Sequence, residues 1–144
     1  PPLPRHCTPT RANLCVASLE GIDSFLFSEF SPPSMHRVYD EDLEVEVIKF
    51  SPLFISCHDP IGSSTAAAFA KLLNGSSTDL TVKLVDSLGA IIEIWKFKVK
   101  PTSIHPLVVL DYKESSAIKW QLECETLGWE IQVVDDKNPS GTVN

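Results

Sequence analysis

The strongest constraint on this chain is a period-two alternation of polar and apolar residues in segments 37–50 and 117–127. The alternating polar residues of the first segment are Asp42, Glu44 and Glu46. Those of the second are Lys119, Gln121, Glu123 and Glu125. Because successive side chains of a strand point to opposite faces, each segment is predicted to be a strand with one apolar and one wet face.

The remaining patterns predict further strands and a single helix. Hydroxyl residues, an alanine-rich stretch and a final Asn-Gly predict a helix over about 63–74. Short apolar runs around turns predict hairpins over 14–30 and 80–100, and strands at 53–55 and 129–134. The prolines at 32–33 and the Pro-Thr-Ser-Ile at 101–104 are predicted to interrupt strands. These patterns together indicate a mainly β chain.

The ends of the chain differ from its middle. Residues 1–12 hold four of the 11 prolines and are predicted to form an extended arm. Residues 135–144 are polar and are predicted to form a flexible tail. The 144 residues, 43% of them hydrophobic, therefore suit one domain over 13–134 that closes by packing alone.

The charge balance limits the partners that the chain can hold. Twelve Lys and Arg face 19 Asp and Glu, a formal net charge of −7 that argues against a protein that grips phosphate broadly. We expect no membrane partner, because no apolar run approaches the roughly 20 residues that span a bilayer. The four cysteines show no metal-ligand spacing, and we expect reduced thiols, with Cys15 and Cys124 buried.

No segment has the pattern of a catalytic, cofactor or metal site. Cys57-His58-Asp59 holds the parts of a nucleophilic site, but neighbours on a strand face opposite ways and do not share a hydrogen bond. We therefore expect no catalytic residue, no cofactor and no metal, and an enzyme is the weakest hypothesis. Lys96, Lys98 and Lys100 alternate along one strand and suit a solvated or partner-facing sheet surface, with a phosphate-contacting stripe as the alternative.

Motifs in the C-terminal half resemble the tail tube proteins of tailed bacteriophages, especially those with contractile tails. The ordered motifs are Asp-Leu-Thr-Val-Lys-Leu-Val-Asp-Ser-Leu-Gly from 79, Ile-Glu-Ile-Trp-Lys-Phe at 92–97, Pro-Thr-Ser-Ile at 101–104, Leu-Asp-Tyr at 110–112, and then the alternating strand. The proline-rich arm and the Ile-His-Pro at 104–106 depart from the family pattern. Tubes of type VI secretion and of phage-like injection particles share this architecture.

The resemblance implies a fold and an assembly. The fold is two packed antiparallel sheets in a β-sandwich or barrel with one flanking helix. The assembly is six-membered rings of this chain, stacked into a tube that conducts the genome into the host. The implied partners are sheath, baseplate and tail terminator proteins, and the implied place is the virion tail, assembled in the host cytoplasm. Segments 1–12 and 31–41 become candidates for contacts between rings.

The same resemblance gives the acidic alternating faces a role. Asp42, Glu44, Glu46, Lys119, Gln121, Glu123 and Glu125 become candidates to line the lumen. A wall of this charge repels double-stranded DNA weakly and lets it pass without specific binding. The alternatives are a baseplate tube initiator, a secretion or injection tube, and a monomeric β-sandwich that binds a partner or decorates a capsid.

Overall fold

The computed structural model describes residues 15–62, 64–107, 110, 112–113 and 117–134. The predicted arm and tail lie outside these residues. The elements in chain order are β1 (Cys15–Leu19), the 3-10 helix η2 (Ser24–Leu26), β2 (Phe27–Ser31), β3 (Met35–Asp40), β4 (Val45–Phe50), β5 (Leu53–His58), α1 (Thr65–Leu73), β6 (Thr78–Val85), β7 (Ile91–Pro106) and β8 (Lys119–Val133). The prediction of a mainly β chain with one helix is confirmed.

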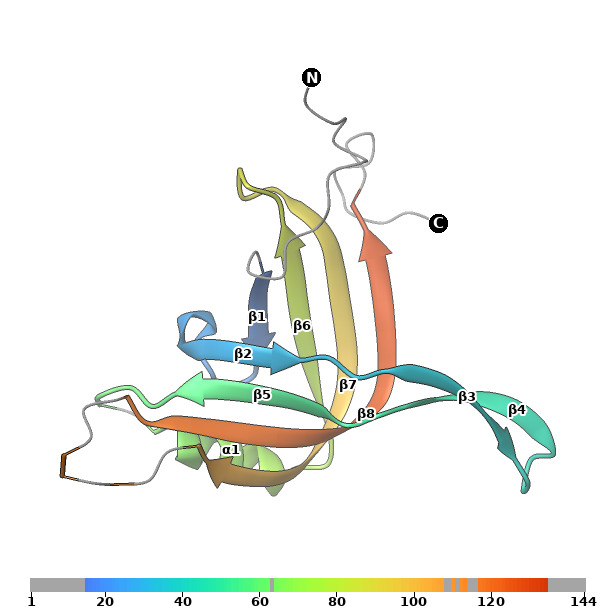
Figure 1. Ribbon diagram of the computed structural model, residues 1–144, viewed down its shortest axis with the longest axis horizontal. Helices are drawn as coiled ribbons and strands as arrows, with labels where there is room; N and C mark the ends of the chain where they lie inside the picture. Colours follow the sequence, from blue (N-terminus) through green and yellow to red (C-terminus); the bar gives the residue numbers. More distant parts are fainter. Residues whose placement is uncertain (1–14, 63, 108–109, 111, 114–116, 135–144) are drawn as a thin grey trace.

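One antiparallel sheet of six strands, in the order β1-β6-β7-β8-β5-β2, forms the body. Its two central strands are long and bend, so the sheet folds over itself (Figure 1). We call β1, β6 and the adjoining parts of β7 (91–99) and β8 (126–133) the β6 half. We call β2, β5 and the rest of β7 (100–106) and β8 (119–125) the β5 half. The two packed layers expected from the resemblance are therefore two halves of one sheet.

The core lies between the two halves. Phe97 of the β6 half packs edge-on against Phe30 of β2, with ring centroids 5.4 Å apart, and so joins the layers. Leu80, Val82 and Val99 on one side and Leu53, Ile55, Leu122 and Cys124 on the other are almost fully buried. The helix α1 packs on β7 and β8 and adds the buried ring of Phe69. Apolar burial on this scale stabilises the fold in proportion to the area removed from water.

Helix α1 confirms the predicted helix over 63–74 and shows why it begins where it does. Ser64 is the N-cap, and its hydroxyl accepts a hydrogen bond from the Ala67 N–H. Asp59 Oδ1 accepts a second one from the Thr65 N–H at 2.8 Å, and the Thr65 hydroxyl donates to the His58 carbonyl at 2.7 Å. The first two bonds satisfy backbone N–H donors that a helix start leaves open. They also fix the helix to the end of β5.

A second sheet, the β3–β4 hairpin, projects from the body (Figure 1). The prediction of one strand over 37–50 is wrong, because residues 41–44 form a turn between two paired strands. In this turn Asp40 Oδ1 accepts hydrogen bonds from the Asp42 and Leu43 N–H groups, and Glu44 takes a positive φ of 57°. A residue with a side chain seldom adopts that conformation, and alternation of residue types does not reveal it.

Three other boundaries differ from the sequence predictions. The predicted hairpin over 14–30 does not form, because β1 pairs with β6 and β2 pairs with β5. Strand β7 continues through Pro101, where register shifts accommodate the proline and β6 no longer pairs with it. Strand β8 continues through Gly128, so the two predicted strands at 117–127 and 129–134 are one. The hairpin over 80–100 and the strand at 53–55 are confirmed as β6–β7 and β5.

Candidate functional site

The outer side of the β5 half carries polar residues from all four strands, with one apolar side chain among them, the half-buried Phe54 between Ser31 and Glu123. Glu29, Ser56, Gln121 and His105 lie opposite one another across the four strands β2, β5, β8 and β7. The adjacent rows add Lys119 beside His58, and Glu123 beside Ser103. We call Glu29, Ser56, His58, Ser103, His105, Lys119, Gln121, Glu123 and Glu125 the polar face. The intervening β8 residues Leu122, Cys124 and Thr126 are buried, as alternation requires.

Hydrogen bonds hold parts of the polar face in place. Ser103 Oγ donates to Glu123 Oε2 at 3.1 Å, and Thr102 Oγ1 donates to the Glu123 carbonyl at the same distance. His105 Nε2 lies 2.5 Å from Gln121 Oε1. These bonds link β7 to β8 beyond the backbone ladder. The face therefore presents carboxylates and neutral polar groups in a fixed arrangement.

The structure separates the two sets of candidate lumen residues. Lys119, Gln121, Glu123 and Glu125 share one face of β8, as predicted. Asp42 and Glu44 lie in the hairpin turn, while Glu46 lies on β4 with its Oε2 3.6 Å from Arg37 Nε. The first set therefore does not form one strand face, and the hairpin carries it away from the polar face (Figure 1).

The sequence analysis missed five members of the polar face, which are Glu29, Ser56, His58, Ser103 and His105. Each lies on a strand other than β8, and only the pairing of distant strands brings them beside the β8 residues. The alternation of 53–58 carried a signal for His58, since Leu53, Ile55 and Cys57 are buried. No local signal reveals the register between β7 and β8.

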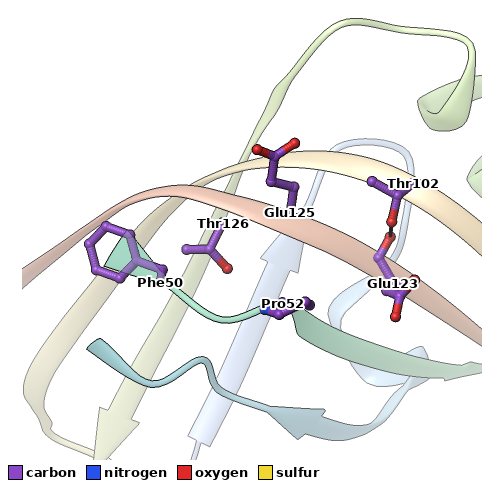
Figure 2. Close-up of a pocket in the computed structure, with 6 residues that line it drawn as sticks. All are labelled: Phe50, Pro52, Thr102, Glu123, Glu125 and Thr126. Atoms are coloured by element: carbon purple, nitrogen blue, oxygen red, sulfur yellow. Dashed lines mark hydrogen bonds between the residues drawn. The ribbon is translucent and has the colours of Figure 1, made fainter. Parts of the chain in front are cut away.

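A small hollow marks the place where the hairpin joins the polar face. Figure 2 shows its lining, with Phe50 and Pro52 from the hairpin side and Glu123 and Glu125 from β8. Its volume is about 140 Å³. Thr126 Oγ1 donates to the Ser51 carbonyl at 3.0 Å and ties the hairpin base to the bend of β8. The hollow holds no pairing of nucleophile and base, so it has no catalytic arrangement.

The Cys57-His58-Asp59 segment is structural in its contacts. Cys57 faces the core and is fully buried, whereas His58 lies on the polar face and Asp59 caps α1. Burial raises the pKa of the Cys57 thiol from 9.0 to about 12. Burial, and secondarily the neighbouring Glu123 carboxylate, raises the pKa of Cys124 to about 12. The predicted burial of Cys124 is confirmed, but that of Cys15 is wrong, because Cys15 is exposed on the edge strand β1.

The raised pKa values predict a loss of stability at high pH. Between pH 9 and about 12 the unfolded thiols lose their protons while the folded thiols keep them. The free energy of unfolding should therefore fall by about 1.4 kcal/mol per pH unit for each thiol across this window. Urea unfolding at about pH 8 and about pH 10 measures it. The Cys57→Ala/Cys124→Ala variant is the control, and an equal pH slope in both proteins would contradict the prediction.

Among the described residues, no group of three or more His, Cys, Asp or Glu is placed to hold a metal ion. No helix among them is long and apolar enough to cross a membrane.

The sheet has unpaired edges. In the described part of the chain nothing pairs with the outer side of β2, nor with β7 over residues 100–106, because β6 pairs only with 91–99. These are the two edges of the β5 half. The outer side of β1 is likewise unpaired within these residues, and so is the side of β8 beyond 124 that faces away from β7. Unpaired edges are templates for strand addition from another chain.

Comparisons with known proteins show the fold. No protein-family model matches the chain. No curated protein matches its sequence. Among solved structures it is similar to a chain of the sheath–tube complex of an extracellular contractile injection system (PVC) in the extended state, with 15% identity over 88% of this chain and 93% of that one, and a TM-score of 0.62. It is also similar to the SPP1 tail tube, with 11% identity over 94% and 86% of the two chains and a TM-score of 0.60. It is similar as well to Hcp1 from Flavobacterium johnsoniae, with 13% identity over 82% of this chain and 94% of that one, and a TM-score of 0.56. The chain therefore has the fold of tail tube and Hcp-type proteins.

Proposed function

We propose that this chain is a tube subunit of a phage tail or a related injection particle, with no enzymatic role. Six copies close into a ring, and rings stack into a tube whose lumen the polar face lines. The observation that carries the proposal is the β5 half itself, which has four strands, one core face, one polar face and two edges that no described residue pairs with. Its likeness to tube proteins supports the same conclusion.

Strand direction supports ring closure. The β5 half runs β7-β8-β5-β2 and alternates in direction throughout. With an even number of strands its two edges run oppositely, so β2 of one copy and β7 of the next meet antiparallel. Repeating this contact continues the sheet and closes it into a barrel, which removes every edge of the β5 half. Six copies would give a barrel of about 24 strands, wider than the porin barrels that leave an aqueous channel.

The charge of the polar face suits passage rather than capture. Glu29, Glu123 and Glu125 outnumber Lys119 and Lys100, the latter opposite Glu125 on β7, so each copy adds net negative charge to the wall. Double-stranded DNA carries one negative charge per about 1.7 Å and is repelled weakly by such a wall within the Debye length of about 8 Å. We propose that DNA passes without specific binding. In this scheme Asp42, Glu44 and Glu46, on the hairpin, lie outside the lumen of their own ring.

The remaining partners follow from this assembly. The hairpin and segment 31–41 project from the β5 half along its strands, and we place them, with the arm over 1–12, at contacts between rings. Sheath, baseplate and tail terminator proteins would meet the tube outside and at its ends. The tube would reside in the virion tail after assembly in the host cytoplasm.

Ring closure is testable on the purified chain. We expect native mass spectrometry to give a particle of six times the chain mass of 15.9 kDa. On assembly, amide hydrogen exchange over 27–31 and 102–105 should slow at least about tenfold, because these amides gain strand partners. The turn over 86–90 serves as control and should not change. A monomer at all concentrations would overturn the ring, and unchanged exchange at both edges in a hexamer would overturn the edge contact.

A protein-conducting tube is the second candidate, favoured by the likeness to the PVC sheath–tube complex and to Hcp1. The ring and the polar face are the same in both functions, and only the cargo differs. Recovery of the cargo from isolated particles decides between them. Double-stranded DNA inside the tube supports genome delivery, and a folded protein inside it supports the injection alternative.

A further inference from the structure

The β6 half extends past the edge of the layer that covers it. Figure 1 shows β6, β7 and β8 crossing β2, which is the edge strand of the β5 half, and continuing beyond it. Phe30 of β2 contacts Phe97 of β7, so the covered part of β7 ends near this ring. Val99, on the covered side of Phe97, has none of its surface exposed. The core side of β7 before Phe97, and of the paired end of β8, therefore lies beyond the β5 half.

This uncovered side is mostly apolar. By alternation from Phe97, Trp95 and Glu93 lie on it, and the register places Trp95 opposite Ile131 and Glu93 opposite Val133. Ile131 and Val133 are 46% and 52% exposed, and Trp95 is half-buried. Trp95 Nε1 donates to Glu93 Oε1 at 3.2 Å, which holds the one carboxylate of this group in place. We call Glu93, Trp95, Ile131 and Val133 the overhang face.

Helix α1 presents a second apolar surface. Thr65 and Phe69 bury its inner side in the core. The residues that face away from the core are three alanines, one leucine and one lysine, at Ala66, Ala67, Ala70, Leu73 and Lys71, and we call them the outer side of α1. Surface helices normally turn a polar face to water, and a helix that is apolar nearly all round is a buried one. We therefore expect the outer side of α1 to be covered in the assembled protein.

The proposed ring brings these two surfaces together. Helix α1 packs on β7, which is the edge of the β5 half opposite β2, and it lies on the same side of that half as the β6 half (Figure 1). When β7 of a second copy pairs with β2, the α1 of that copy comes to lie behind the added strands. The part of the β6 half that extends past β2 lies at the same place. The overhang face and the α1 of adjacent copies therefore meet.

We propose that the overhang face of each copy packs on the outer side of α1 of the next copy in the ring. The small alanine side chains let the ring of Trp95 and the branched side chains of β8 approach the helix closely, and the contact removes both apolar surfaces from water. Glu93 faces Lys71, so the two surfaces carry opposite charges. The proposal rests on the ring proposed above. It adds a side-chain contact between neighbours to the backbone pairing of β2 with β7.

Cross-linking tests the contact directly. In a Cys7→Ser/Cys15→Ser background, Ile131→Cys protein is co-assembled with Ala70→Cys protein and treated with a short bis-maleimide. We expect a cross-linked pair on a denaturing gel. Glu130→Cys is the matched control, because Glu130 is exposed and adjoins Ile131 but points to the opposite side of β8. It should give at least about tenfold less product with Ala70→Cys, and equal yields, or no product from Ile131→Cys, would overturn the proposal.

Exchange of the two charges gives an independent test. We expect Lys71→Glu and Glu93→Lys each to raise the concentration for half-assembly at least about fivefold, because like charges then meet. The chain that carries both changes should return to within about twofold of the wild type. Lys71 is exposed, so Lys71→Glu should leave the urea midpoint of the unassembled chain unchanged. No effect of Lys71→Glu on assembly, or no rescue by the second change, would overturn the contact.

The outcomes separate this contact from the tube itself. Rings that form without the cross-link between Ile131→Cys and Ala70→Cys would overturn the contact and leave the tube function standing. A chain that stays monomeric at all concentrations would overturn the ring, and this contact with it.

Discussion

Replacing Phe97 with alanine should lower the free energy of unfolding by about 3–5 kcal/mol. Phe97 is 1% exposed and lies on β7, at the centre of the sheet. Its ring contacts Trp129 at 5.0 Å and Phe30 at 5.4 Å between centroids, and only the second contact crosses from one half to the other. Truncation removes buried apolar area and leaves a cavity where the halves meet. Urea unfolding followed by tryptophan fluorescence measures the loss.

The control for this prediction is Phe25→Ala. Phe25 is 79% exposed in η2, so its truncation should change stability by no more than about 0.5 kcal/mol. A loss below about 1 kcal/mol for Phe97→Ala would mean that the two halves do not depend on this contact. We also expect Phe97→Ala to weaken assembly, since both edges of the β5 half depend on the packing that holds its curvature.

Reversing two charges on the polar face should make the assembled particles bind double-stranded DNA. Glu123→Lys/Glu125→Lys changes each copy by four charges on the face proposed to line the lumen, and a ring multiplies the change. We expect the affinity of assembled particles for double-stranded DNA to rise by at least about 10³-fold at 50 mM salt and to fall steeply by 200 mM salt, because bound cations are released from DNA. Co-sedimentation of DNA with the particles measures it.

A matched variant separates position from net charge. Glu20→Lys/Asp23→Lys makes the same change of four charges in the exposed turn between β1 and η2, away from the polar face. We expect it to change DNA affinity less than about tenfold. Equal gains in the two variants would show that DNA responds to overall charge and that the β8 carboxylates do not line a channel.

Local chemistry made part of the fold predictable. The helix followed from its hydroxyl cap and alanines, and the β6–β7 hairpin followed from Asp86 and Gly89. In that turn Asp86 Oδ1 accepts hydrogen bonds from the Leu88 and Ala90 N–H groups, and Gly89 has a positive φ of 86°. Signals of this kind act over a few residues, so the sequence contains them directly.

Contacts between distant residues were not predictable in the same way. Strands β1 and β2 are neighbours in the chain but lie at opposite edges of the sheet, because each finds its partner far along the sequence. The alternation from Lys119 to Glu125 predicted the part of the polar face that lies on β8. The residues from β2, β5 and β7 could be placed beside it only from the register in which these strands pair. Pro101 predicted an interruption of the strand because proline is excluded from central strands. In the structure it lies where β7 no longer pairs with β6 and has become an edge strand.

Electron microscopy of the assembled chain tests the central claim most directly. The account predicts rings or rods of uniform width with a central channel, six copies per ring, and the polar face of β8 toward that channel in the averaged density. Dispersed particles of one copy at all concentrations would contradict it and would favour a monomeric β-sandwich that binds a partner. Rings with the polar face turned outward would contradict the assignment of the lumen.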